Sequence, residues 1–317
     1  MKQRRRKYND DVEEDRLSDL PDCVILHILS FLDAMRCSNF MTSFNKFVSR
    51  ILSLRNAKSS LRILHFERDG TVQHRLLQRM VKYAVSHNVQ QLSINPISDI
   101  QHFPTCFFSC RTLTYLKLAL IHPTNYMGTL FPISLDLPAL ATLSLESFIF
   151  PVGDDGCVDP FSAFSSLNSL IIRYCRVLGQ QNLCISSATL DDLTIEKHNK
   201  YDKIELSTPS LCTFVFVCEG NIPALKLHGI ERNLSSVKHV KIDVSILGSI
   251  VVDTSLALLN WLVELANIKS LTINHNALEV EFHSLCNLKS LRVKMRTPSS
   301  ISNGTLYFLL QNSPSAK

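Results

Sequence analysis

The sequence predicts an α/β fold, a solenoid whose parallel strands form one continuous ribbon. The first observation is a six-residue pattern, L-x-x-L-x-L, which is clearest at Leu140-Ala-Thr-Leu143-Ser-Leu145 and recurs with other apolar residues along most of the chain. The second is its spacing, because successive copies start 20 to 31 residues apart. The ten copies begin at Leu61, Val89, Leu113, Leu140, Leu167, Leu190, Leu211, Val237, Ile268 and Leu288.

Each copy is expected to be one strand of the ribbon. Side chains alternate along an extended segment, so the fourth and sixth positions point into a core, whereas the third, fifth and seventh point away from it. A single strand cannot bury its apolar face alone, but a stack of such strands can. The spacing largely matches the roughly 20–29-residue period of leucine-rich repeats. A leucine-rich-repeat solenoid is therefore predicted over residues 56–310.

Two kinds of connector are expected between the strands. Some are short and irregular, with Pro, Ser or Asp before the next strand, and others carry apolar residues at helical spacing. A last helix is expected over residues 305–310. The helical stripes are Leu76, Leu77, Met80, Val81, Ala84 and Val85 within 75–87, and Leu258, Leu259, Leu262, Val263 and Leu265 within 255–266.

The N-terminal region differs from the repeats. Residues 1–14 are polar and charged and are expected to be a basic, disordered tail, and residues 311–317 a second tail. Residues 15–55 are predicted to be a helical segment, in which Ser18 or Asp19 caps the first helix and Pro21 suits its first turn. Its stripes at helical spacing are Val24, Ile25, Ile28, Leu29 and Leu32, followed by Phe44, Phe47, Val48, Ile51 and Leu52.

The segment DRLSDLPDCVILHILSFLD, residues 15–33, resembles the opening of a plant F-box motif, in which D-R-[IL]-S-x-L-P-D precedes a helix ending in [IL]-L-S-F-L. The segments FNKFVSRILSLRNAKSSLRILHF, FSCRTLTYLKL and LDLPALATLSLESFIF are similar to those of F-box/leucine-rich-repeat members of that family. The resemblance extends over about residues 15–310.

The sequence departs from this family after Leu32. A proline-containing turn and a basic segment with a tryptophan normally follow there. Here Leu32 continues into Asp33-Ala-Met-Arg-Cys-Ser38, and the only tryptophan of the chain is Trp261. The F-box-like segment is therefore truncated relative to the family's motif.

The resemblance implies a substrate-recognition subunit of a Skp–cullin–F-box ubiquitin ligase. Its partners are then a Skp-type adaptor, bound by the F-box, and a target protein of unknown identity, bound by the repeats. Two alternatives to this role stay open. The chain is either a leucine-rich-repeat interaction scaffold outside the ligase or a degenerate relative that no longer binds the adaptor. By the resemblance, the adaptor-binding residues are Leu17, Leu20, Pro21, Val24, Ile25, Leu29 and Leu32.

The outward strand positions form the expected binding surface, on the concave side of the solenoid. This surface mixes charges of both signs with apolar residues, which suits a protein or peptide partner more than a polyanion. Equally, these residues are compatible with a face that is simply covered, and a small-molecule receptor would need a pocket there. The predicted partner-binding residues are Tyr115, Lys117, Glu146, Ile171, Arg173, Glu196, Val215, Val217, Lys241, Asp243 and Arg292.

Composition excludes several other classes of function. The net charge of +5 equals the charge of Lys2, Arg4, Arg5, Arg6 and Lys7, so the remaining chain is neutral and no nucleic-acid surface is expected. The apolar stretch 245–266 contains Asp253, Asn260 and Glu264, so no membrane span is expected. The ten cysteines are expected to be reduced thiols in the nucleus or cytoplasm.

No enzymatic site is predicted. The sequence contains no G-x-S-x-G, P-loop, G-x-G-x-x-G or H-E-x-x-H motif, and glycine is scarce at 9 residues. Its 11 histidines are scattered along the chain. The sequence therefore predicts a binding protein without catalytic residues, metal or cofactor.

Overall fold

The computed structural model of the chain describes residues 48, 50, 61–121, 128–132, 134–151, 159–179, 182–197, 201–219, 222–228, 236–245, 251–265, 268–274 and 288–294. Both predicted tails, the F-box-like helix over 15–32 and the predicted helix over 305–310 lie outside these residues. Within the predicted segment 15–55, Val48 and Arg50 are described, both are helical, and Val48 is buried.

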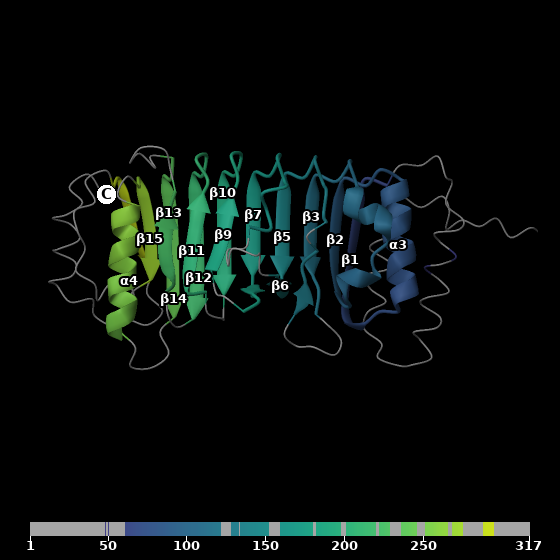
Figure 1. Ribbon diagram of the computed structural model, residues 1–317, viewed down its shortest axis with the longest axis horizontal. Helices are drawn as coiled ribbons and strands as arrows, with labels where there is room; N and C mark the ends of the chain where they lie inside the picture. Colours follow the sequence, from purple (N-terminus) through teal and green to yellow (C-terminus); the bar gives the residue numbers. More distant parts are fainter. Residues whose placement is uncertain are drawn as a thin grey trace, which may run out of the picture.

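A ten-stranded, entirely parallel sheet runs the length of the described chain, and its strands follow one another in sequence order (Figure 1). Every predicted copy of the apolar pattern forms one of its strands, so the predicted parallel ribbon is confirmed. The strands are β1 Ile63–Thr71, β2 Gln91–Ile97, β3 Tyr115–Ala119, β5 Thr142–Glu146, β7 Ser169–Arg173, β10 Asp192–Lys197, β12 Thr213–Glu219, β14 His239–Ser245, β15 Ser270–Asn274 and β16 Ser290–Lys294.

The repeat pattern places its apolar residues in one core. The first residue of every copy is buried, and so are the fourth and sixth residues of the first nine copies. The exceptions are Leu291 and Val293 of the edge strand β16, which are partly buried. Equivalent positions lie side by side, as in the pairing of Leu143 with Leu116 on one side and with Leu170 on the other.

A chain of backbone hydrogen bonds fixes this register. The carbonyl oxygen of Thr114, the second residue of its copy, accepts bonds from Ala141 N (2.9 Å) and Thr142 N (3.0 Å) of the next copy. The same paired bonds recur at each junction from the carbonyl of Arg62 to that of Lys269. A slip of one residue would break these bonds and would also turn the apolar side chains out of the core.

Two shorter parallel sheets form the opposite wall of the core. One contains β4 Thr129–Leu130, β6 Phe148–Phe150 and β8 Arg176–Val177, and the other contains β9 Asn182–Ser186, β11 Lys203–Ser207 and β13 Ala224–Leu227. Side chains of both sheets, such as Phe148 and Ile204, join the same core as the ten-stranded sheet. Connectors expected to be helical or irregular therefore contain strands of their own.

The two predicted helical connectors are confirmed. They are α3 His74–Ser86 and α4 Val251–Glu264, which lie toward opposite ends of the ribbon (Figure 1). Two short 3₁₀ turns, η2 Ile100–His102 and η3 Thr105–Ser109, pack near α3. Helix α3 buries Leu76, Leu77, Met80, Val81 and Ala84, as predicted.

The predicted stripe of α4 is wrong at Val263, whose exposed fraction is 55%. The buried side of α4 instead includes Leu258, Trp261 and Leu262, because the large indole occupies the core position. Trp261 is fully buried, its ring stacks on Phe214 at a centroid distance of 5.6 Å, and Nε1 donates to the Pro223 carbonyl oxygen at 2.7 Å. Helix α4 is thus fixed to strand β12 and to the segment before β13.

The predicted reduced thiols are present at Cys106, Cys110, Cys175, Cys212 and Cys218. The prediction is wrong at Cys184, which is disulfide-bonded. Residue spacing does not specify which thiols a fold brings together, because disulfide formation depends on the geometry of the folded backbone. Among the described residues, no helix is both long and apolar enough to cross a membrane.

Candidate functional site

The candidate site is the face of the ten-stranded sheet that points away from the core, called here the open face. It consists of the third, fifth and seventh positions of the repeat copies. All eleven predicted partner-binding residues lie on this face. Arg292 is exposed, and the ten that are half-buried are Tyr115, Lys117, Glu146, Ile171, Arg173, Glu196, Val215, Val217, Lys241 and Asp243. The predicted adaptor-binding residues, Leu17 to Leu32, lie outside the described part of the chain.

Strand pairing places the apolar members of the open face on strands near the middle of the ribbon. Thr194 of β10 pairs with Ile171 of β7 and with Val215 of β12. Val217 lies two residues beyond Val215 and pairs with Glu196. Val215 and Val217 therefore form a small apolar patch on β12, and Ile171 lies two strands away, about 9.6 Å from Val215, with Thr194 between them.

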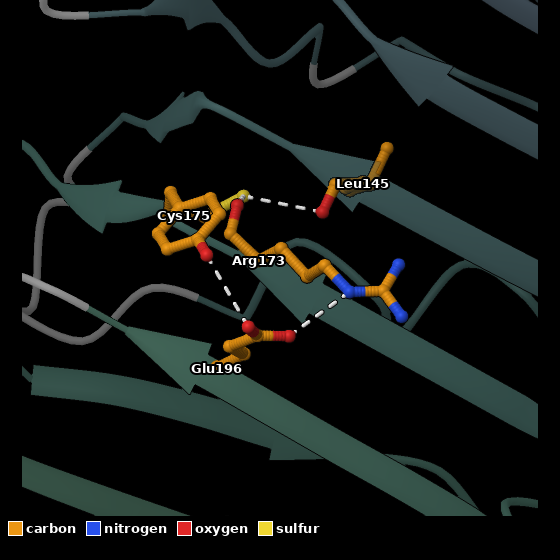
Figure 2. A network of polar contacts seen from close by, with 5 residues as sticks. Leu145, Arg173, Cys175 and Glu196 are labelled. Carbon is orange, nitrogen blue, oxygen red and sulfur yellow. Dashed lines mark hydrogen bonds and ion pairs between the residues drawn. The ribbon is translucent and has the colours of Figure 1, made fainter. Parts of the chain in front are cut away.

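The charged residues beside this patch are paired with one another (Figure 2). Arg173 Nε donates to Glu196 Oε2 at 3.1 Å, and the Tyr174 hydroxyl donates to Glu196 Oε1 at 3.2 Å. Burial and the Glu196 carboxylate raise the pKa of the Tyr174 phenol. Both partners of the ion pair are about one-third exposed, so solvent screens it and its stabilisation is expected to be below about 1 kcal/mol.

Tyr174 was not identified from the sequence. It follows the last residue of β7 with a φ of 52°, a conformation that few residues other than glycine adopt, and its N–H donates to the Glu196 carbonyl oxygen at 2.8 Å. Ser147 after β5 has a similar φ of 63°. The two residues follow the last residues of the paired strands β5 and β7. Neither is a glycine or an asparagine, so the sequence does not indicate a positive φ at these positions.

A buried thiol supports the same strand ends from the core side. Cys175 Sγ lies 3.7 Å from Leu145 O (Figure 2) and 3.3 Å from Arg173 O. It also accepts a hydrogen bond from Phe148 N at 3.4 Å. Burial raises the pKa of the Cys175 thiol to about 12. The thiol therefore stays protonated at neutral pH and is not a nucleophile. Its position in the repeat is the one that carries Asn or Cys in leucine-rich repeats, a signal that the sequence analysis did not use.

The last three strands carry a different set of charges. Lys238, Lys269 and Lys289 occupy the second position of successive copies and are exposed, beside Arg292 and Lys294 of β16. Sequence reasoning missed the three second-position lysines, because strict alternation places that position on the core side. In the structure each lies just before its strand, where the backbone turns the side chain out to solvent.

One polar network closes the end of β14. The Asn274 side chain, which is buried, donates from Nδ2 to the Val244 carbonyl oxygen at 2.5 Å and to Asp243 Oδ1 at 3.1 Å. Its Oδ1 accepts from Val244 N at 3.3 Å. Asp243, the one carboxylate on the described parts of β14, β15 and β16, is therefore engaged by a structural amide.

A second charged group lies on the opposite wall of the molecule. Glu205 of β11 accepts from Lys203 Nζ at 2.5 Å and from His228 Nε2 at 2.6 Å. Lys203 and, to a smaller extent, His228 lower the pKa of the Glu205 carboxyl. Within the described residues, no three His, Cys, Asp or Glu side chains form a group that could hold a metal ion. The arrangement is that of a surface ion-pair group.

Comparison with known proteins gives three relatives, all from Arabidopsis thaliana and all named F-box/LRR-repeat proteins. The first is 27% identical and its match covers 72% of this chain and 60% of the relative. The second is 25% identical over 99% of this chain and 72% of its own length, and the third 23% identical over 77% and 55%. The chain thus matches between about half and three-quarters of each relative. No family model matches, and neither does any solved structure.

Proposed function

Because this chain is a relative of the plant F-box/leucine-rich-repeat proteins, we propose that it is a substrate-recognition subunit of a Skp–cullin–F-box ubiquitin ligase. In this proposal the segment 15–55 binds the Skp-type adaptor, and the open face binds the target protein. The chain carries out no chemistry itself. It raises the effective concentration of the target beside the ligase, in the nucleus or the cytoplasm.

The observation that carries this proposal is that one chain combines a broad, largely half-buried polar sheet face with an F-box-like sequence. The ten strands place thirty outward positions in three rows, and the described residues of those rows mix Tyr115, Lys241, Val215 and Glu196 without a metal-binding group. A mixed surface of this kind suits a protein partner, in which apolar contacts are surrounded by polar ones.

The adaptor-binding part of the proposal is tested with the purified full-length chain and a Skp-type adaptor. We expect a complex in a pull-down and in size-exclusion chromatography. The double variant Leu20→Asp with Pro21→Ala should lose the adaptor, because it places a charge in the predicted interface and removes the proline that favours the first turn of the predicted helix. Its thermal unfolding should match that of the unchanged chain.

The control variant is Leu178→Asp, which changes an exposed leucine of the repeat body in the same way. It should keep the adaptor. If the chain does not bind the adaptor, but binds it once a basic, tryptophan-bearing segment is inserted after Leu32, the chain is instead the degenerate relative. Unaltered binding by the Leu20→Asp, Pro21→Ala variant would reject the proposed adaptor interface.

A further inference from the structure

The described parts of the last three repeat copies concentrate positive charge on the open face and at the starts of the strands that form it. They contain six cationic side chains, of which five are exposed and Lys241 is half-buried, and one carboxylate, Asp243. The six are Lys238, Lys241, Lys269, Lys289, Arg292 and Lys294, called here the cationic end. In contrast, the described parts of the copies that form β7, β10 and β12 contain four carboxylates and two cations.

Backbone pairing sets three of these cations side by side. Lys269 N donates to Lys238 O at 2.9 Å, and Lys289 N donates to Lys269 O at 2.8 Å. The three lysines therefore occupy the same repeat position, one residue before adjacent strands, with their backbones about 4.8 Å apart. Like charges on directly adjacent strands destabilise a sheet, so this row works against folding rather than for it.

The described residues leave the six cations of this end without an ion-pair partner. Within that part of the chain, none of the six cations forms an ion pair or a side-chain hydrogen bond, and Asp243 is held by Asn274. The Arg173–Glu196 pair shows what the same fold does where charges are satisfied internally. A cluster of unpaired cations at one end of a sheet is complementary to an anionic partner.

The neighbouring strand indicates which anionic partner fits. Val215 and Val217 of β12 pair with Lys241 and Asp243 of β14, so an apolar surface borders the cationic end. Beyond it, at the start of β10, lie Asp191 and Asp192, which are exposed and would repel a continuing phosphate backbone. An extended protein segment matches this arrangement, because the distance from β12 to β16 is about 14 Å, the length of about four extended residues.

We propose that the cationic end binds an acidic segment of a partner protein, laid across β14, β15 and β16, with an adjoining apolar side chain on Val215 and Val217. If the proposed function holds, this acidic segment belongs to the target protein, and that assignment rests on the proposed function. The binding itself requires no ligase component, so it can succeed or fail independently of adaptor binding.

The test is a fluorescence-anisotropy titration of the full-length chain with a labelled peptide, Leu-Gly followed by six glutamates. We expect saturable binding that weakens as salt is raised, because exposed charges are screened. The variant Lys269→Glu with Lys289→Glu should bind about tenfold or more weakly, since two favourable charges become unfavourable ones. The same peptide with six glutamines should not bind.

The matched control is Lys82→Glu with Lys226→Glu, which changes the net charge equally at two exposed lysines of α3 and β13. It should bind the acidic peptide within about twofold of the unchanged chain, with both variants unfolding at the same temperature. Equal losses in the two variants would overturn the proposal, because binding would then follow net charge alone. Tighter binding of a single-stranded oligonucleotide, lost in the Lys269→Glu, Lys289→Glu variant, would also overturn it. So would a concentration-dependent dimer abolished by that variant.

Discussion

The middle of the open face and its last three strands are built on the same frame, but they treat charge in opposite ways. On β7 and β10 the Arg173 guanidinium and the Glu196 carboxylate bind each other. Just before β14, β15 and β16 the row of Lys238, Lys269 and Lys289 is exposed, with no ion pair among the described residues. The outward positions therefore vary between the two regions, whereas the buried positions of the repeat stay apolar. We expect partner binding to depend on the outward charges that have no partner within the sheet.

The constant part of the frame is its core. In both regions the first, fourth and sixth positions of each copy face inward, as Leu167, Leu170 and Ile172 do in one and Ile268, Leu271 and Ile273 do in the other. The predictions below therefore change the shared core first, then the middle region, and then the individual charges.

The largest expected effect is that of Trp261→Ala. The indole contacts Phe214 and Phe216 of β12, the strand between the two regions, and donates to the Pro223 carbonyl. Its removal should lower the free energy of unfolding by about 3–5 kcal/mol, measured by urea denaturation followed by circular dichroism. Trp261→Phe should cost less, because it keeps most of the volume. A loss below about 1 kcal/mol for Trp261→Ala would mean that α4 is not part of the common core.

The second prediction concerns the middle region alone and uses pH. Burial raises the pKa of Cys175 from 9.0 to about 12, so the folded chain holds this proton where the unfolded chain releases it. Its contribution to stability is complete below about pH 9 and is lost as pH rises toward about 12, at about 1.4 kcal/mol per pH unit. The variant Cys175→Ser should show a shallower decline of unfolding free energy between pH 9 and 10.5. Identical slopes would contradict the burial of this thiol.

The smallest effects are those of single charges, and here the two regions should differ in sign. Arg173→Ala removes one partner of a screened ion pair and should destabilise the chain by below about 1 kcal/mol. Lys269→Ala relieves repulsion in the lysine row and should be neutral or stabilising by a few tenths of a kcal/mol, about the size of other like-charge pairs. Urea denaturation at low salt measures both. Destabilisation by Lys269→Ala equal to that by Arg173→Ala would show that this lysine has a structural partner.

The repeat frame was predictable because its signal is periodic. Residues such as Leu140, Leu143 and Leu145 recur at the same offsets, and burial requires all copies to adopt one register. The strands of the second wall were missed, although polar and apolar residues alternate in Lys203–Ser207 as they do in a strand. These segments are short, and the turns beside them differ from copy to copy. They therefore do not recur at a fixed spacing from which strands could have been predicted.

The strand residues of the candidate site could be predicted from the sequence, but the residues just before and just after the strands could not. The alternation of strand side chains placed Arg173, Glu196 and Val215 on one face correctly. It failed for Lys238 and its equivalents, because the backbone before each strand is not extended in the same way. It also could not indicate that Tyr174 adopts a positive φ and reaches Glu196, since this depends on how one strand ends beside the next.

The most direct test of the account is a map of lysine reactivity. The full-length chain is acetylated with and without the acidic peptide, and each modified lysine is quantified by mass spectrometry. We expect protection at Lys238, Lys269 and Lys289, and none at Lys82 on α3 or Lys226 on β13. Protection spread equally over all five lysines, or confined to Lys82 and Lys226, would contradict the claim that the unpaired charges of the last three strands form the binding surface.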